Sequence, residues 1–281
     1  MDRISVNRFS FRRKGSHKKN KEENAEPEFN FSTLSYISQD EAEKMNEELL
    51  SEYAFNEVQL LELAGYSSAV ATAKCYPVEK MTRDNGAILV CCGPGYNGGV
   101  GLVCARHLKL LGYRPTVFYP VKSNLASICD SLSRQCESLD LPFLSYFPSE
   151  SHLIQDSYNL VVDALFGFRF KPPVKDTFAS VIETLKKVEI PICSVDVPSG
   201  WGAESASPDG LQPELLISIA APKRCAKLFQ GKFHYLGGRF VPRTLEQKFD
   251  LKLPPYPGTD CVVELKTQKS TEDEKPDDTG E

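Results

Sequence analysis

The chain has 281 residues, of which 41% are hydrophobic and 25% charged, and its formal net charge is −5. This hydrophobic content supports a sizeable buried core, which excludes a wholly disordered chain. The ends differ from the middle: residues 1–35 form a basic head and residues 266–281 an acidic tail, and neither can bury enough apolar surface to fold alone. We therefore predict one α/β domain over residues 36–265 between two disordered tails.

The sequence contains neither the apolar run of a secretory signal nor the roughly 18 apolar residues of a bilayer-spanning helix. We expect a cytoplasmic protein with no nucleic-acid partner. Two alternatives stay open: a mitochondrial address in the basic head, and release of the chain from the cell without a signal peptide. The nine cysteines form no C-x-x-C pair, so they are expected to be reduced core residues rather than zinc or redox ligands.

The predicted elements begin with two helices, one starting at Ser38 with a capping box and one starting near Asn56. We expect this pair to pack across the outside of a sheet. From Gly86 onward, short β-branched runs alternate with amphipathic segments. The predicted strands are 87–92, 116–119, 143–146, 160–163, 192–196 and 215–219, and the predicted helices between them are 102–111, 125–139 and 178–188.

This alternation of strands and helices predicts a three-layer, Rossmann-like α/β fold. Its sheet is mostly parallel, with right-handed crossovers and helices on both faces. Residues 223–256, which are rich in aromatic residues, Gly and Pro, are expected to form an irregular wrap. In such a fold, ligands bind beyond the carboxyl ends of the strands, where the strand order reverses.

A glycine-rich segment, residues 93–101, follows the first predicted strand and runs directly into a helix. Glycines let the backbone turn sharply, and free amides at a helix start attract an anion. Residues 93–98 match G-x-G-x-x-G, so we predict a phosphate loop, with a tight packing turn as the alternative. The second strand ends without an acid to hold a ribose, which argues against an ordinary NAD dehydrogenase.

Two later strands end in an acid, Asp163 and Asp196, and both acids should reach the same edge as the glycine-rich segment. With the amide oxygen of Asn97 and the hydroxyl of Ser199, they form an oxygen-rich set that suits a hard cation. The alternative is that each aspartate caps a loop by accepting backbone N–H bonds.

Three cations are candidates for contact with a phosphate. Arg169 and Lys171 lie in the loop between the two acids, and Lys223 follows the last predicted strand. Each of them is equally compatible with a plain exposed loop cation.

In this order the motifs resemble the YjeF N-terminal domain family, with the segments Leu-Leu-Glu-Leu-Ala-Gly at 60–65 and Val-Asp-Val-Pro-Ser-Gly at 195–200 included. The resemblance implies binding of a hydrated nicotinamide nucleotide and a potassium ion, and interconversion of the two stereoisomers of the hydrate, the NAD(P)HX epimerase reaction. It also implies site residues. The potassium positions are Asn97, Asp163 and Ser199, and the nucleotide positions are Tyr96, Asn97, Gly98, Gly99, Val100, Gly167, Phe168, Arg169, Phe170, Lys171 and Asp196.

Two residues depart from the family's epimerase motif, Asn-Asn-Gly-Gly-Asp-Gly: Tyr96 replaces its first asparagine and Val100 its aspartate. Epimerising the hydrate requires a group that exchanges protons, and losing such a group costs about two to four orders of magnitude in rate. We therefore predict a non-catalytic relative that needs no cofactor, although potassium and a nicotinamide nucleotide remain permitted ligands. If the chain is active, Asp163 or Asp196 would be the catalytic residue.

The same departures are similar to the branch of the family that binds apolipoprotein A-I. That resemblance implies association with apolipoprotein A-I, promotion of cholesterol efflux to high-density lipoprotein, and downstream effects on angiogenesis and on blood and vessel development. A homodimer is a further expectation. A nucleotide sensor, whose bound ligand alters partner binding, is a third possibility alongside the interaction protein and the active epimerase.

Overall fold

The computed structural model describes residues 29–83, 85–120, 126–174 and 176–266. Within them, one sheet runs in the order β3-β2-β1-β4-β5-β6-β7-β8, and every pair is parallel except the antiparallel pair β7–β8. The predicted mostly parallel sheet is therefore confirmed. The strands are β1 (Ala87–Cys92), β2 (Arg114–Phe118), β3 (Phe143–Leu144), β4 (Leu160–Ala164), β5 (Ile192–Val195), β6 (Leu215–Ile219), β7 (Phe233–Gly237) and β8 (Val262–Glu264).

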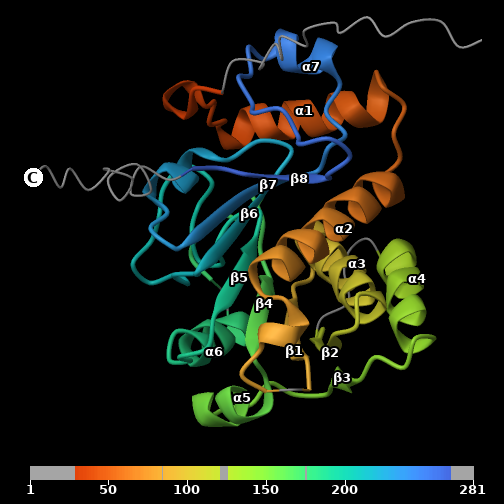
Figure 1. The fold of residues 1–281 in the computed structure, drawn as a ribbon, viewed down its shortest axis with the longest axis vertical. Coiled ribbons are helices and arrows are strands. Elements are labelled where there is room, and N and C mark those ends of the chain that lie inside the picture. The colour runs from red at the N-terminus through yellow and green to blue at the C-terminus, as the bar shows by residue number, and fades with distance from the viewer. Residues whose placement is uncertain (1–28, 84, 121–125, 175, 267–281) are drawn as a thin grey trace, which may run out of the picture.

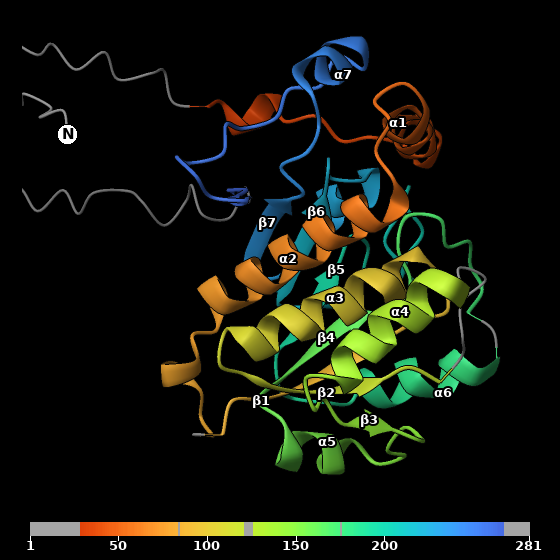
Figure 2. The same ribbon diagram turned by 90° about the vertical axis from the view of Figure 1, so that its right-hand side faces the viewer.

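Helices cover both faces of the sheet, as the three-layer prediction requires. One face carries α2 (Glu57–Cys75), α3 (Tyr96–Leu110) and α4 (Ala126–Glu137), and the other carries α5 (Ser151–Ser157) and α6 (Asp176–Leu185) (Figures 1 and 2). Side chains of β1 alternate between the two cores: Ile88 and Val90 join the α2–α3–α4 core, and Leu89 joins the α5–α6 core. A strand buried on both faces reads as a continuous apolar run, which explains the sequence of β1.

The first helix, α1 (Gln39–Ser51), begins with the predicted capping box between Ser38 and Glu41. Its position differs from the prediction. Together with α7 (Arg243–Lys248), α1 lies above the carboxyl edge of the sheet instead of along its outside (Figure 1). The apolar side chains of α1 bury against the start of α2 and against α7, which makes α1 a roof over the strand ends.

The prediction of an irregular wrap over residues 223–256 was wrong in part, because β7 and α7 form there. The segment of β7 is only five residues long and pairs in parallel with β6, so its strand state is set by that neighbour more than by its own composition. Residues 29–35, which we expected in the disordered head, include a 3₁₀ turn, and Leu34 packs against Leu236 and Val263. Residues 1–28 and 267–281 of the two predicted tails lie outside the described residues.

The strand order reverses between β1 and β4, because β2 and β3 lie on one side of β1 and β4 to β7 on the other. The loops after β1 and β4 therefore part at this point, which is where doubly wound folds bind ligands. All nine cysteines are free thiols and seven of them are buried, as predicted. No helix in the described parts of the chain has the length and apolarity to cross a bilayer.

Candidate functional site

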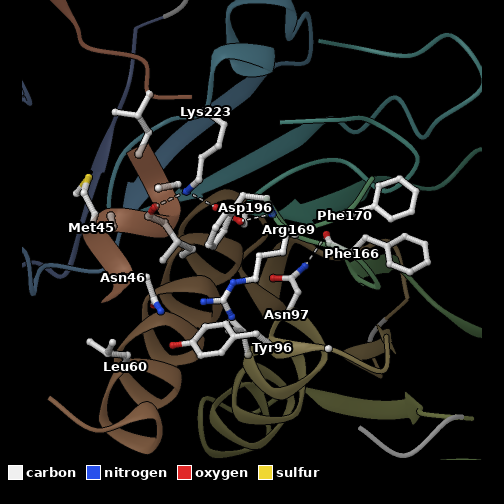
Figure 3. A pocket seen from close by; sticks show the side chains of 18 of the residues that line it. Met45, Asn46, Leu60, Tyr96, Asn97, Phe166, Arg169, Phe170, Asp196 and Lys223 are labelled. Carbon is white, nitrogen blue, oxygen red and sulfur yellow. Dashed lines mark hydrogen bonds and ion pairs between the residues drawn. The ribbon is translucent and has the colours of Figure 1, made fainter. Parts of the chain in front are cut away.

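A cavity of about 380 Å³ opens at the carboxyl ends of β1, β4, β5 and β6, beneath α1. This volume lies in the range of roughly 300–1,000 Å³ that small-molecule sites occupy. Residues from α1 and the start of α2 face loop residues across it (Figure 3). Eight of the sequence-predicted nucleotide residues line the cavity, namely Tyr96, Asn97, Val100, Gly167, Phe168, Arg169, Phe170 and Asp196.

The remaining predicted residues lie elsewhere. Gly98, Gly99 and Lys171 are not among the lining residues, nor are Asp163 and Ser199. Lys223, which the sequence offered only as one of several loop cations, does line the cavity and is 3% exposed.

The glycine-rich segment is mostly helix rather than loop, because α3 begins at Tyr96. A Cβ on Gly98 would overlap the carbonyl oxygen of Gly93, and one on Gly101 would crowd Ala164 and Cys92. These glycines let α3 approach the sheet closely, which is the packing-turn alternative. Gly95 differs, because it is exposed and a Cβ there meets nothing within 4 Å. It is the N-cap residue of α3 and makes no side-chain capping bond, so the start of α3 lines the cavity without a side-chain cap.

Asp163, at the end of β4, is completely buried and accepts four hydrogen bonds. Its Oδ1 accepts from the Ser199 hydroxyl at 2.5 Å and the Leu165 N–H at 3.2 Å, and its Oδ2 accepts from the Ser194 hydroxyl at 2.7 Å and the Ser199 N–H at 2.9 Å. Burial raises the pKa of Asp163, and the hydrogen bonds act in the opposite direction. Asp163 thus ties the loops after β4 and β5 together, and its oxygens are all engaged.

Asp196, just beyond β5, is 5% exposed and lies at the cavity wall. Its Oδ1 is 2.6 Å from the Nζ of Lys223, and its Oδ2 accepts from the Phe168 N–H at 2.9 Å. The Lys223 ammonium also donates to the carbonyls of Ile219 and Ala221, so each of its three protons has an acceptor. The φ of Asp196 is +68°, a left-handed conformation that aspartate adopts more readily than most other non-glycine residues.

Asn97 connects the loops after β4 and β5, because its Nδ2 donates to the carbonyls of Phe166 at 2.8 Å and Val195 at 3.1 Å. With Asp163 and Ser199, these carbonyl oxygens form a set of the donor type that potassium takes. The residues therefore fit a monovalent cation by chemistry. In the arrangement described, protein hydrogen bonds satisfy the same oxygens, and the amide of Asn97 presents its nitrogen to the two carbonyls.

Arg169 extends across the cavity over the ring of Tyr96, toward Asn46 (Figure 3). Its guanidinium carbon is 5.9 Å from the centroid of the Tyr96 ring and 5.3 Å from that of Phe168, both cation–π distances. Burial raises the pKa of the Tyr96 phenol, so this hydroxyl is neutral at physiological pH. Tyr96, which replaces the asparagine of the family motif, therefore provides an aromatic face for the Arg169 guanidinium.

The sequence did not predict the roof of the cavity. Met45, Asn46 and Leu49 of α1 line it, together with Leu60 and Phe240. The capping box revealed α1 as a helix, but no sequence signal showed that its apolar face turns toward the strand ends. Only the tertiary packing of α1 on α2 and α7 places it there.

The fold defines a Rossmann-like α/β protein, and the cavity at its switch point is a candidate ligand site. The profile of the family described as YjeF-related protein N-terminus matches residues 57–225. The crystal structure of yeast ynu0 (YNL200c) is similar over 83% of this chain and 100% of that chain, with 38% sequence identity and a TM-score of 0.78. The chain belongs to the YjeF N-terminal domain family.

Proposed function

We propose that this protein is a non-catalytic relative of NAD(P)HX epimerase. The observation that carries the proposal is Val100, which is 2% exposed and lines the cavity at the position where the epimerase motif has aspartate. An isopropyl group cannot exchange protons, and general acid–base catalysis contributes about two to four orders of magnitude in rate. In this proposal neither potassium nor a nucleotide is required.

The state of the two remaining acids supports the same proposal. Asp163 does not line the cavity and accepts four hydrogen bonds from the protein. Asp196 lines it, but both of its oxygens are engaged, one by Lys223 and one by Phe168. A catalytic proton carrier must reach the substrate within hydrogen-bond distance, and the position of Asp163 behind the cavity wall argues against this role.

The test is epimerisation of purified NAD(P)HX by the native chain, by Val100→Asp and by Val100→Asn, beside a family member with the loop aspartate. We expect the native chain and Val100→Asn to be slower than that relative by at least about two orders of magnitude. Val100→Asn introduces a polar side chain of the same size as aspartate that is not an acid. A native rate comparable to that of the relative would overturn the proposal.

For the role that replaces catalysis, we propose binding of apolipoprotein A-I, with promotion of cholesterol efflux to high-density lipoprotein and downstream effects on angiogenesis and vascular development. The similarity of the Tyr96 and Val100 departures to the apolipoprotein-binding branch of the family supports this role, which also requires release of the chain from the cell. Saturable binding of the full chain to immobilised apolipoprotein A-I is the expected result. Its absence for folded protein would remove this part of the proposal and leave the enzymatic part untouched.

The second candidate is an active epimerase, and the feature that favours it is the Asp196–Lys223 pair at the cavity wall. A carboxylate beside an ammonium is a chemically sound proton relay. Activity that Asp196→Asn abolishes in a folded protein would establish this alternative in place of the first.

A further inference from the structure

The wall of the cavity is mainly apolar. Its roof side is formed by Met45, Leu49 and Leu60, and Val100 and Phe240 continue this surface. Val100 keeps this surface continuous, because the aspartate of the epimerase motif would interrupt the apolar wall with a charge. A ligand that fills this part of the cavity gains free energy by burying apolar atoms.

Three of the described residues that line the cavity carry a formal charge: Arg169, Asp196 and Lys223. Asp196 and Lys223 neutralise each other at 2.6 Å, and both are almost completely buried. Arg169 makes no ion pair within the described part of the chain, since its contacts are with the rings of Tyr96 and Phe168. The cavity therefore has a net charge of about +1, and that charge is located at Arg169.

The stacking of Arg169 leaves the edges of its guanidinium group available. Cation–π contacts use the face of the guanidinium plane, whereas a carboxylate binds in that plane through two parallel N–H donors. The planar fork of arginine matches a carboxylate in this bidentate manner. The uncapped start of α3, at Gly95 and Tyr96, lies on the same wall and favours negative charge as well.

A dinucleotide fits these features poorly. Its ribose hydroxyls need free acceptors, which dinucleotide sites usually supply with an acid. Asp196 is the acid among the described lining residues, and Lys223 and the Phe168 N–H already occupy one acceptor position on each of its oxygens, which leaves fewer acceptors for a ribose.

We propose that the cavity binds an amphipathic monocarboxylate, a molecule with an extended apolar body and one carboxylate. The carboxylate pairs with Arg169, and the body lies against the roof residues Met45, Leu49 and Leu60. This inference goes beyond the proposed function, and it does not depend on apolipoprotein binding.

The experiment is calorimetric titration of the full chain with decanoate, with decanol and with nicotinamide mononucleotide, below the concentrations at which decanoate forms micelles. The variants are Arg169→Gln, Asn46→Asp and the control Lys171→Gln, which removes an exposed cation of the same loop outside the cavity. Asn46→Asp is isosteric and supplies a competing carboxylate on the side toward which Arg169 extends (Figure 3).

We expect decanoate to bind with one-to-one stoichiometry and up to about fivefold more tightly than decanol, because Arg169 is exposed at the cavity and solvent screens its ion pair with a carboxylate. Arg169→Gln and Asn46→Asp should lower decanoate affinity by up to about fivefold and leave decanol affinity unchanged, whereas Lys171→Gln should bind like the native chain. Equal losses in Arg169→Gln and Lys171→Gln would contradict the inference, because they would indicate a surface charge effect. Binding of nicotinamide mononucleotide without binding of decanoate would also overturn it.

Discussion

The ends of β4 and β5 carry the same side chain in two different environments. Asp163, near the end of β4, is completely buried and accepts four protein hydrogen bonds, whereas Asp196, just beyond β5, borders the cavity and pairs with Lys223. We call these the closed end and the open end. In this sheet, an acid at a strand end therefore borders the candidate ligand site only where the surrounding protein leaves it at the cavity.

The glycine-rich segment divides in the same way. Gly93 and Gly98 pack against each other, and Gly93 packs against Leu165 at the closed end, with no room for a side chain. Gly95 lies at the open end with space around it. One continuous motif therefore serves packing on one side and access to the cavity on the other.

The largest expected effect is at the closed end, in Asp163→Ala. The substitution leaves the buried donors of Ser194, Ser199 and Leu165 without their acceptor, and each unsatisfied donor costs about 1–3 kcal/mol. We expect the free energy of unfolding to fall by about 3–5 kcal/mol in urea denaturation followed by circular dichroism. The exposed Asp209→Ala should change it by no more than about 0.5 kcal/mol. A loss below about 1 kcal/mol for Asp163→Ala would mean that these donors find other acceptors.

The second comparison is Gly98→Ala against Gly95→Ala. The new methyl group of Gly98→Ala overlaps the Gly93 carbonyl, and overpacking of this kind costs about 3 kcal/mol. Gly95→Ala should cost less than about 1 kcal/mol, because its methyl group meets open space and only the N-cap preference is lost. Melting temperatures of the two variants measure the difference, and equal values would refute the division of the segment.

At the open end, Asp196→Asn should lower the free energy of unfolding by about 2–3 kcal/mol. Asparagine keeps an acceptor for the Phe168 N–H and tolerates the left-handed φ, so the main loss is the countercharge of the buried Lys223. Asp196→Ala should cost about 1 kcal/mol more, because alanine is strained at positive φ. Urea denaturation followed by circular dichroism measures both losses. An Asp196→Asn variant as stable as the native chain would show that the Asp196–Lys223 pair contributes no net stability.

A smaller effect, on the pH dependence of stability, is expected from His234 in β7, which belongs to neither the closed end nor the open end. Burial lowers the pKa of His234 to about 3, below the value of about 6.5 expected in the unfolded chain. Since the unfolded state takes up the proton first, stability present above pH 6.5 falls by about 1.4 kcal/mol per pH unit as the pH drops toward 3. Unfolding free energies measured from pH 7.5 to pH 5 should show this slope in the native chain and in the exposed control His152→Gln. The slope should be lost in His234→Gln, and its persistence there would assign the acid sensitivity to other groups.

The order of elements was predictable because it depends on local patterns. The capping box at Ser38, the apolar run of β1 and the alternation of strands and helices all follow from side-chain periodicity within short windows. The segment of β7 was missed because the residues around it, 223–256, are rich in Gly, Pro and aromatic residues, and no pattern in them shows that β7 pairs with β6. Strand formation there is a tertiary effect, which local propensity does not encode.

The sequence by itself determined the fold class, the family, and the presence of Asn97, Val100, Arg169 and Asp196 at one edge of the sheet. The tertiary structure decided which of these residues face the cavity, because a side chain's direction depends on where a helix starts and on which hydrogen bonds are already made. In the structure, Asp163 lies behind the cavity wall, Gly98 lies within α3, and the apolar face of α1 covers the strand ends. These outcomes depend on contacts between distant segments, whereas sequence patterns record only neighbours along the chain.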